Sequence, residues 1–522
     1  MLIWDTVEVG RNDAVNLVNA VYGSRVLPRR RAVQLAGLAV VIGAMLSSDV
    51  METARKGIFK PGYLDITDAI AIYASVYIVD TVLLYGYSAF AMPVSTTASL
   101  VFELLGAAVV MSLLRGQGDL VQWPVAGKVI TAIIVSVIVS GIASFLIQRI
   151  IRGAIRDRTT DLATLRTHGT WVGGGMATGL VFFMLIKGMS KVQVVAQARE
   201  WIVNFDHELK AWFASGVTGP EAAAGFSYGM VIVLIGLWVL FAALIHGLLR
   251  VYRQRAAKRV FPVIAVIGMV AMAIAFGQND LANCASPGLA TITLLFHWEA
   301  GTAAATKVPI AWYMLLGCGV LLFLGMRTKN AVRVTKAGVE MGSHNDRVQL
   351  YAPQWCLALG ERIARRRNRE ASLAPRPARS ERGKRIHFDA LRASTIMCVS
   401  ASVIAFASSY GWPVSTTYVT FAAIVGSGMG DKIYGRGDAG LKVARSIWVF
   451  TSWFLAALIA ATFTGIVCLV VAYTGIIGLV ITLGINLYLR RQLKRRGDAQ
   501  IARSHEEMLE RAFPERYAEE DV

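Results

Sequence analysis

Long apolar stretches, each bounded by polar or basic residues, dominate the hydrophobic pattern of this chain. Residues 261–276, for example, include no charged side chain. A helix needs about 20 mostly apolar residues to cross the hydrocarbon core of a membrane, so the pattern predicts about eleven or twelve membrane helices. The stretches are residues 32–51, 70–90, 94–114, 129–147, 170–186, 228–249, 261–276, 310–326, 395–409, 414–430 and one or two within 447–489. We therefore expect an all-α integral membrane protein.

Composition and charge agree with this class. Hydrophobic residues make up 55% of the chain and the mean hydropathy is +0.53, which is too apolar for a soluble domain. The net charge of +19 could suggest nucleic-acid binding, but the excess Lys and Arg lies between the apolar stretches, at residues 25–31, 149–166, 250–259, 327–385 and 490–496. Basic loops mark the cytoplasmic side of membrane proteins. We expect a multi-pass protein of the cell inner (plasma) membrane, with membrane lipid as a partner and no nucleic acid.

Two short motifs occur twice along the chain. GRNDAVN at residues 10–16 recurs as GQNDLAN at 277–283, and PVSTT at 93–97 recurs at 413–417. The chain is therefore a duplication. If the basic loops all lie on the cytoplasmic side, the segment after the first PVSTT runs toward the outside. The segment after the second PVSTT then runs toward the cytoplasm. The two repeats are thus inverted, with broken or re-entrant helices, as in many secondary transporters.

The repeats predict six segments along the chain. These are a first inverted repeat (1–187), an external connecting segment (188–226), the start of the second repeat (227–326), a basic cytoplasmic loop that is partly disordered (327–390), the rest of the second repeat (391–489) and a cytoplasmic tail (490–522). Only nine residues precede Gly10, so the first helix is either shortened or recorded from a late start. Arg55, Lys56 and Lys60 are exceptions to the charge rule, because they fall on the outer side.

The PVSTT motifs predict helix starts that can bind an anion. Proline followed by serine and threonine is typical of a helix N-terminus, where free backbone N–H groups and the helix dipole favour negative charge. Two such starts from inverted repeats could surround one tetrahedral anion. The predicted hydroxyl ligands are Ser95, Thr96, Thr97, Ser415, Thr416 and Thr417. The alternative is that these hydroxyls only pack helices together, as Ser and Thr often do in membranes.

The Asn-Asp motifs offer complementary chemistry. Asp13 and Asp280 are hard oxygen ligands for a coupling cation, and sodium is one candidate. The four amides, Asn12, Asn16, Asn279 and Asn283, could bind the anion. An Asp and the Asn three positions later share one helix face, so each pair can point into one cavity. Asp80 and Glu103 lie within apolar stretches, and each is either a proton or cation site or a satisfied partner between helices.

Both motif pairs resemble the inorganic phosphate transporter family, the PiT permeases, in a divergent bacterial branch. Members carry G-A-N-D-V-A-N and P-[VI]-S-T-T-H type motifs, and the resemblance covers residues 10–106 and 277–466. It implies symport of inorganic phosphate with a sodium ion or proton, no other cofactor, and a site built from the Asn, Asp, Ser and Thr residues named above. The family's histidine after STT is replaced by Ala98 and Tyr418, and Arg11 and Gln278 replace a small residue.

The expected function is therefore cation-coupled import of phosphate by alternating access. Another tetrahedral oxyanion, such as sulfate or arsenate, is an alternative substrate, and a channel or a non-transporting phosphate sensor is an alternative class. An enzyme acting on phosphate esters is not expected, because the sequence has no P-loop or H-E-x-x-H motif. A homodimer is one assembly that the sequence leaves open.

Overall fold

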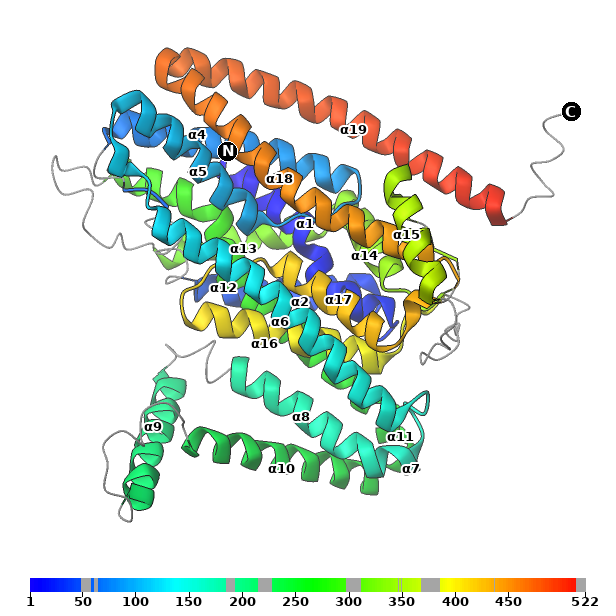
Figure 1. Cartoon of the computed structure of the whole chain (residues 1–522). Helices are drawn as coiled ribbons and strands as arrows, with labels where there is room; N and C mark the ends of the chain where they lie inside the picture. Colours follow the sequence, from blue (N-terminus) through cyan, green and yellow to red (C-terminus); the bar gives the residue numbers. More distant parts are fainter. Residues whose placement is uncertain are drawn as a thin grey trace, which may run out of the picture.

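The computed structural model describes residues 1–47, 58–60, 64–184, 193–214, 228–296, 311–345, 347–348, 350–367, 385–435 and 437–512. The regular structure in these residues is helical, apart from one isolated antiparallel bridge between Phe59 and Val121 (Figure 1). The longer helices are α1 (Leu2–Gly23), α2 (Arg29–Met45), α4 (Ile66–Ala89), α5 (Thr96–Arg115), α6 (Trp123–Ile155), α8 (Thr170–Val181), α9 (Gln193–Ala214), α10 (Tyr228–Val251), α12 (Val260–Phe296), α13 (Trp312–Met326), α14 (Lys329–Met341), α15 (Gln354–Arg367), α16 (Ala390–Ser409), α17 (Thr416–Gly430), α18 (Ala439–Thr474) and α19 (Ile476–Ala512). Short α7 (Leu162–Thr164) and α11 (Arg253–Ala257) lie in connections.

The helices confirm the predicted fold class. Among the described residues, eight helices are long and apolar enough to cross a membrane, or nine if α13 and α14, which meet at 67°, count as one span. This number is below the predicted one because three of the predicted stretches form short helices. Helices α2, α8 and α17 have only 17, 12 and 15 residues. The chain is a multi-pass membrane protein.

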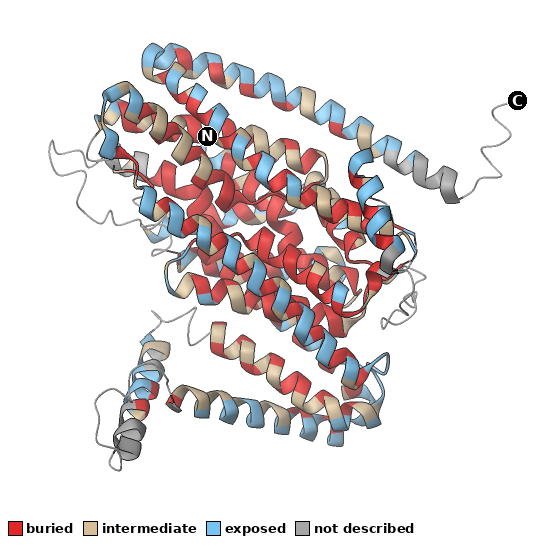
Figure 2. Ribbon diagram, viewed as in Figure 1, coloured by how far each residue is buried: buried red, intermediate tan, exposed pale blue. Residues whose placement is uncertain are grey.

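Burial is concentrated in the middle of the bundle (Figure 2). The apolar window of α4 is 72% buried and that of α16 is 78% buried, whereas the window of α10 is only 6% buried. A helix that is apolar on its exposed face is suited to contact with lipid tails rather than water. The outer helices α10 and α19 therefore face the membrane, and α4 and α16 belong to the interior.

Each PVSTT motif lies at the tip of a helical hairpin. At the base of the first hairpin, Asp68 near the start of α4 accepts two 2.7 Å hydrogen bonds from Arg115 at the end of α5. At the base of the second, Arg152 binds both Asp389, which caps the start of α16, and Asp431, which follows α17. Both ends of a hairpin thus lie together, so each pair of helices enters the bundle and returns. This confirms the predicted re-entrant helices, and it means that the four apolar stretches are two hairpins rather than four crossings.

The hairpins enter from opposite ends of the bundle. The first base lies near Phe59 and the start of α6, because Phe59 pairs with Val121 just before that helix. The second base contacts Arg152, in the last turn of α6. At about 1.5 Å per residue, α6 is about 50 Å long, so the two bases are separated by the thickness of the membrane. The repeats are inverted as predicted.

Contacts between the two repeats come in equivalent pairs, as inverted repeats require. In the described part of the chain, α1 contacts α13 while α12 contacts α2, and α5 contacts α18 while α17 contacts α6. The first glycine of each Asn-Asp motif allows these helices to pack closely. A Cβ atom at Gly10 would overlap the backbone of Leu322, and one at Gly277 would overlap the backbone of Val40. These glycines allow backbone contact that brings both motifs to the centre.

The two hairpin tips share one unusual backbone conformation. Ala91 has a φ of +55° and Gly411, at the matching position before its own PVSTT, has a φ of +67°. Glycine tolerates this left-handed region, whereas a residue with a side chain is destabilised there by roughly 1–2 kcal/mol. The carbonyl of Ala91 accepts a 3.0 Å hydrogen bond from Arg445 of α18. The first tip is therefore the more strained of the two and is held by an arginine.

The basic segment 327–390 is more structured than the sequence suggested. It contains α14, which packs on α1, and α15, which packs on α18. The predicted loop thus contains two helices, and each has an apolar face that is buried on the bundle. Residues 368–384 of this segment lie outside the described part of the chain, as do Arg55 and Lys56. Helix α9 forms within the predicted external connecting segment.

Candidate functional site

The predicted site residues lie where the middle of α1 and α12 meets the two hairpin tips. All ten predicted substrate ligands, with Asp13 and Asp280, are at most 3% exposed. Helix α5 begins at Thr96 and α17 begins at Thr416, which confirms the predicted helix starts. The sequence motifs therefore converge on one buried centre.

The first asparagine of each motif holds a hairpin tip of its own repeat. The Asn12 side chain accepts a hydrogen bond from the Val94 backbone N–H (3.1 Å) and donates one to the Met92 carbonyl (3.2 Å). The Asn279 side chain likewise binds the N–H and the carbonyl of Val414, at 3.3 and 2.6 Å. These amides were predicted as substrate ligands. In this structure their hydrogen bonds position the backbone that leads into each helix start.

The second asparagine of each motif reaches across to the other repeat. Asn16 donates to the Thr417 hydroxyl at 2.8 Å, and Asn283 donates to the Thr97 hydroxyl at 2.7 Å. Each also donates to the aspartate of its own motif, Asn16 to Asp13 at 3.2 Å and Asn283 to Asp280 at 3.0 Å. The inverted repeats are thus linked by the same pair of hydrogen bonds in both directions.

The two aspartates approach each other through a single hydroxyl. The Thr96 Oγ1 atom lies 3.2 Å from an Asp13 oxygen and 3.1 Å from an Asp280 oxygen. Thr417 donates to the other oxygen of Asp13 at 2.9 Å, and the Thr416 hydroxyl lies beside Asp280. A hydroxyl has one hydrogen to donate, so Thr96 cannot satisfy both carboxylates. A proton or a cation is needed between them.

Among the described residues, no positively charged side chain balances the charge of the two aspartates. Neither Asp13 nor Asp280 forms an ion pair with Lys, Arg or His in the part of the chain that the structure covers. Two buried, uncompensated carboxylates are strongly destabilising. Oxygen atoms from carboxylates and hydroxyls are the ligands that hard cations prefer. The centre therefore has the chemistry to hold a small cation.

The serines of the PVSTT motifs cap the two helix starts. Ser95 accepts from the Ala98 N–H at 2.9 Å, and Ser415 accepts from the Tyr418 N–H at 3.1 Å. The two starts also touch, because Thr97 donates to the Val414 carbonyl at 3.0 Å. Each serine keeps its own hydroxyl hydrogen for another acceptor. The serines thus fix the helix ends that would face an anion.

A second group of carboxyl side chains lies deeper in the first repeat. The Ser99 hydroxyl is 2.8 Å from Asp80 and 2.9 Å from Glu103, and Asp5 of α1 interacts with Asp80. Each of these three acids is at most 3% exposed. Sequence reasoning identified Asp80 and Glu103 but missed Asp5. Asp5 could have been recognised as a candidate from its position about two helical turns before Asp13, on the same face of α1.

This second group has no equivalent in the other repeat. When the PVSTT motifs are aligned, Asp80 matches Ser400 and Glu103 matches Ala423, and when the Asn-Asp motifs are aligned, Asp5 matches Met272. We call Asp5, Asp80, Glu103 and Ser99 the carboxyl cluster. The central site is built from both repeats, whereas the carboxyl cluster belongs to one.

Comparison with known proteins identifies the family. The model of the phosphate transporter family matches residues 9–345, more than half of the chain. The chain belongs to the phosphate transporter family. A candidate phosphate permease of Pyrococcus furiosus is 26% identical over 475 residues, covering 88% of this chain and 92% of that protein. One of Pyrococcus abyssi is 25% identical over 478 residues, covering 88% and 93%.

A solved structure shares the fold of this phosphate transporter family member. It is titled "The sodium-dependent phosphate transporter", and it matches with a TM-score of 0.63 and 20% identity, over 91% of this chain and 97% of that one. At this identity the similarity concerns the fold alone.

Residues that depart from the family motifs have structural partners. Arg11 forms a 2.7 Å ion pair with Glu8 one turn earlier and lies over the ring of Tyr85. Arg490 of α19 pairs with the same Glu8. Tyr418, in place of the family's histidine, stacks on Trp453 and lies beside Ser95. Arg11 is thus engaged with Glu8, and Tyr418 extends the contact between the two helix starts.

A buried arginine ties the base of the second hairpin to α6. Arg152 donates to Asp431 at 2.9 and 3.0 Å and to Asp389 at 2.8 and 3.1 Å. Its side chain is 0% exposed. Burial would raise the pKa of Asp431, but Arg152 and His344 outweigh it and hold that pKa below its usual range. The Asp389 carboxylate also accepts a hydrogen bond from the backbone N–H of Arg392, at 3.1 Å.

Proposed function

We propose that this member of the phosphate transporter family imports inorganic phosphate together with a cation, by alternating access across the plasma membrane. One observation carries the proposal: two inverted helix starts meet at a pair of buried carboxylates that share one hydroxyl donor. The basic end of the bundle, which holds Arg152 and the loops rich in Lys and Arg, would face the cytoplasm. The permease relatives and the family model support phosphate as the substrate.

Electrostatics explains why phosphate and cation would travel together. Phosphate groups carry about −1.5 to −2 charges at neutral pH, and Asp13 and Asp280 are already negative when ionised. Bringing the anion to this centre alone would add repulsion and desolvation cost. A sodium ion or proton at the two aspartates removes both penalties. Phosphate could then bind at the helix starts, where backbone N–H groups and the helix dipole favour an anion.

The described structure encloses the centre. Every predicted ligand is almost fully buried, so phosphate can reach it only if a hairpin tip moves. The tips enter from opposite ends, and moving one tip at a time would open the site to one side of the membrane at a time. The strained Ala91 tip, held by Arg445, is on the path from the basic end.

The carboxyl cluster is proposed as a second cation or proton site. Its three acids have no Lys or Arg ion-pair partner among the described residues, and the Ser99 hydroxyl again faces two carboxyl groups. We expect Glu103→Gln to allow exchange of phosphate across the membrane but to reduce concentrative uptake driven by a cation gradient. Labelled-phosphate counterflow and gradient-driven uptake in proteoliposomes measure the two separately. Equal loss of both, or of neither, would contradict this role, and the exposed Glu200→Gln is the control.

The capping serines give a second prediction. Ser415→Ala removes both the hydroxyl and the cap of α17, which stabilises a helix by about 1 kcal/mol, whereas Ser415→Gly largely keeps the cap. If the hydroxyl contacts phosphate, both variants should weaken phosphate affinity several-fold and change cation affinity less. Isothermal calorimetry on the purified protein measures both affinities. A Gly variant with wild-type phosphate affinity would show that Ser415 acts only as a cap.

Transport itself is tested with purified protein in proteoliposomes. Sodium and proton gradients are imposed separately and uptake of labelled phosphate is followed, which also identifies the coupling ion. A carrier accelerates exchange when unlabelled phosphate is present on the far side, whereas a channel does not, and a sensor binds phosphate without moving it. Competition by sulfate or arsenate tests the alternative substrates. Binding without uptake under either gradient would overturn the proposal.

A further inference from the structure

Arg445 is a buried arginine near the start of α18, and it is only 3% exposed. It donates hydrogen bonds to two backbone carbonyls, that of Ala91 at 3.0 Å and that of Tyr351 at 2.9 Å. In the part of the chain that the structure describes, no Asp or Glu pairs with it. The buried arginines Arg152 and Arg490, by contrast, each bind a carboxylate. Arg445 is thus a buried positive charge that is held by neutral groups alone.

The two carbonyls offset this burial only in part. Taking an ion out of water without an opposite charge is strongly destabilising, and a neutral carbonyl compensates a cation less than a charged acceptor does. A guanidinium group has five N–H donors, and the two carbonyls of Ala91 and Tyr351 engage two of them. Arg445 therefore has both the charge and the donors to bind an anion.

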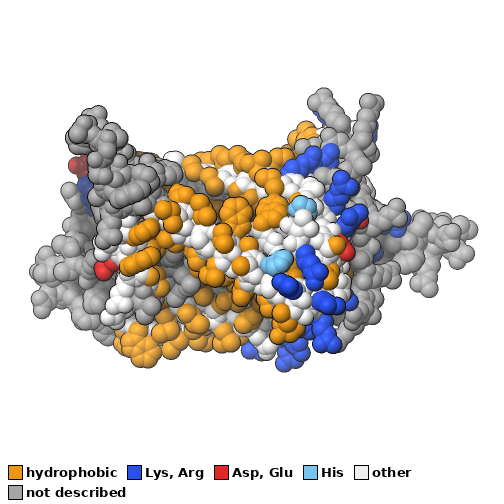
Figure 3. Space-filling view, turned by 90° about the horizontal axis from the view of Figure 1, so that it is seen from below, with side chains coloured by type: hydrophobic (Ala, Val, Ile, Leu, Met, Phe, Trp, Pro, Cys, Tyr) orange, Lys and Arg blue, Asp and Glu red, His pale blue; other side chains and the backbone are white. Residues whose placement is uncertain are grey.

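Arg445 lies between the central site and the cytoplasmic end of the bundle. On one side of it is the tip of the first hairpin, where Asn12 binds the Val94 N–H that leads into the α5 helix start. On the other side is Tyr351, in the segment just before α15, at the end of the molecule where Lys and Arg gather (Figure 3). In the proposed transport cycle, phosphate that leaves for the cytoplasm must separate the tip from this segment. Both contacts of Arg445 then break.

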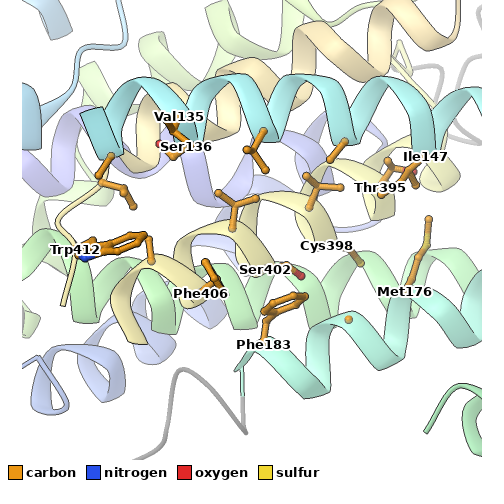
Figure 4. Close-up of a pocket in the computed structure, with 18 of the residues that line it drawn as sticks. Val135, Ser136, Ile147, Met176, Phe183, Thr395, Cys398, Ser402, Phe406 and Trp412 are labelled. Atoms are coloured by element: carbon orange, nitrogen blue, oxygen red, sulfur yellow. The ribbon is translucent and has the colours of Figure 1, made fainter. Parts of the chain in front are cut away.

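The other repeat has no such arginine. When the PVSTT motifs are aligned, Arg445 matches Val125 of α6, and the packing agrees, because α5 contacts α18 as α17 contacts α6. Val125 lines an apolar groove together with Trp412 of the second tip (Figure 4). Lys128, a charged residue of the same lining, has an exposed side chain. Since a valine side chain cannot donate a hydrogen bond, a buried arginine serves the cytoplasmic side alone.

We propose that Arg445 binds phosphate as it leaves the central site for the cytoplasm. This inference rests on the proposed function. In the described form the guanidinium joins the first tip to the cytoplasmic segment, and when these separate, phosphate oxygens replace the two carbonyls. The planar guanidinium fork matches the geometry of phosphate and can bind it through two parallel hydrogen bonds. The anion in turn supplies the negative charge that this buried arginine lacks.

Phosphate transport measured from each side of the membrane tests the proposal. Right-side-out and inside-out vesicles are prepared from a host that lacks phosphate transporters of its own, and initial rates give the KM on the external and the cytoplasmic side. Arg445→Gln keeps an N–H donor for the tip carbonyl but loses the charge. It should raise the cytoplasmic KM at least about tenfold, the usual effect of a lost hydrogen bond between charged groups, and the external KM less than about twofold. Arg445→Lys should raise the cytoplasmic KM about fourfold, because lysine keeps the charge but not the fork.

An arginine that only held the tip and the segment together would give the opposite result. Its loss would favour the form open to the cytoplasm, so the cytoplasmic KM would fall or stay unchanged. Either outcome, or an equal rise on both sides, would overturn the proposal. The thermal midpoint shows which variants are folded, and Arg445→Lys decides if Arg445→Gln is not. Arg362→Gln, at an exposed position of α15, is the control and should change neither KM. A wild type that moves no phosphate in either direction would overturn the proposed function, and this inference with it.

Discussion

Asp280→Asn is expected to lower the uptake of labelled phosphate by at least about 100-fold. The Asp280 carboxylate accepts hydrogen bonds from Asn283 at 3.0 Å and Thr96 at 3.1 Å, and bonds to a charged group contribute about 1.5–3 kcal/mol each. An amide at this position turns two N–H donors toward neighbouring donors and removes the charge that would hold a cation. The measurement is initial uptake in proteoliposomes under the gradient that drives the wild type.

Two further variants make this result specific. Asp13→Asn should have a similar effect, because Asp13 occupies the inverted position and shares the Thr96 hydroxyl. Asp119→Asn, on an exposed turn before α6, should leave uptake unchanged. The thermal midpoint of each purified variant shows whether it remains folded. Uptake by folded Asp280→Asn within twofold of the wild type would remove Asp280 from the mechanism.

Arg152→Met should reduce the free energy of unfolding by about 3–5 kcal/mol, the usual cost of leaving a buried charge without its partner. Arg152 compensates both Asp389 and Asp431, so its loss leaves two carboxylates at the base of the second hairpin. We expect a lower thermal midpoint in detergent and faster proteolysis near this base. The matched control is Arg149→Met, which removes an exposed arginine one turn earlier on the same helix.

The pH dependence of this effect follows from the direction of the Asp431 shift. Its pKa is held below the usual carboxyl range by Arg152 and His344, against the effect of burial. A carboxyl group with a lowered pKa in the folded state stabilises the protein above its unfolded pKa, and that contribution is lost as the pH falls through the folded pKa. The wild-type contribution of Asp431 should thus be complete above about pH 4 and be lost below it. In Arg152→Met the buried carboxyl groups lack their main compensating charge, so this variant should regain stability as the pH falls and they take up protons. The difference between wild type and Arg152→Met should therefore shrink on acidification, and a difference that grows as the pH falls would contradict the assignment.

The sequence predicted the repeats, their inversion and the two helix starts because each leaves a local signal. Apolar length, basic loops and a proline before Ser-Thr-Thr can all be recognised without knowing which helices touch. The number of crossings was overestimated because an apolar stretch that enters and returns has the same composition as one that crosses. The ion pairs of Asp68 with Arg115, and of Arg152 with both Asp389 and Asp431, show that each hairpin closes on itself.

The roles of individual site residues depend on packing and could not be predicted from spacing. Asn12 and Asn16 are equally polar and belong to one motif, yet the first binds the tip of its own repeat and the second reaches Thr417 in the other. Asp5 was missed because nothing near it in sequence is repeated. The helices of segment 327–390 were missed because their high charge hides short apolar faces.

The carboxyl cluster has a consequence for the symmetry of the whole molecule. Rotating an ideal inverted duplication by half a turn in the membrane plane exchanges its inner and outer faces and leaves it unchanged, so such a molecule would treat the two compartments alike. Asp5, Asp80 and Glu103 have no image under that rotation, and neither does the strained alanine at the first tip. In the proposed transport cycle, the outward-open and inward-open forms would therefore be chemically distinct states, and they could differ in population and in ion affinity even when no gradient is present.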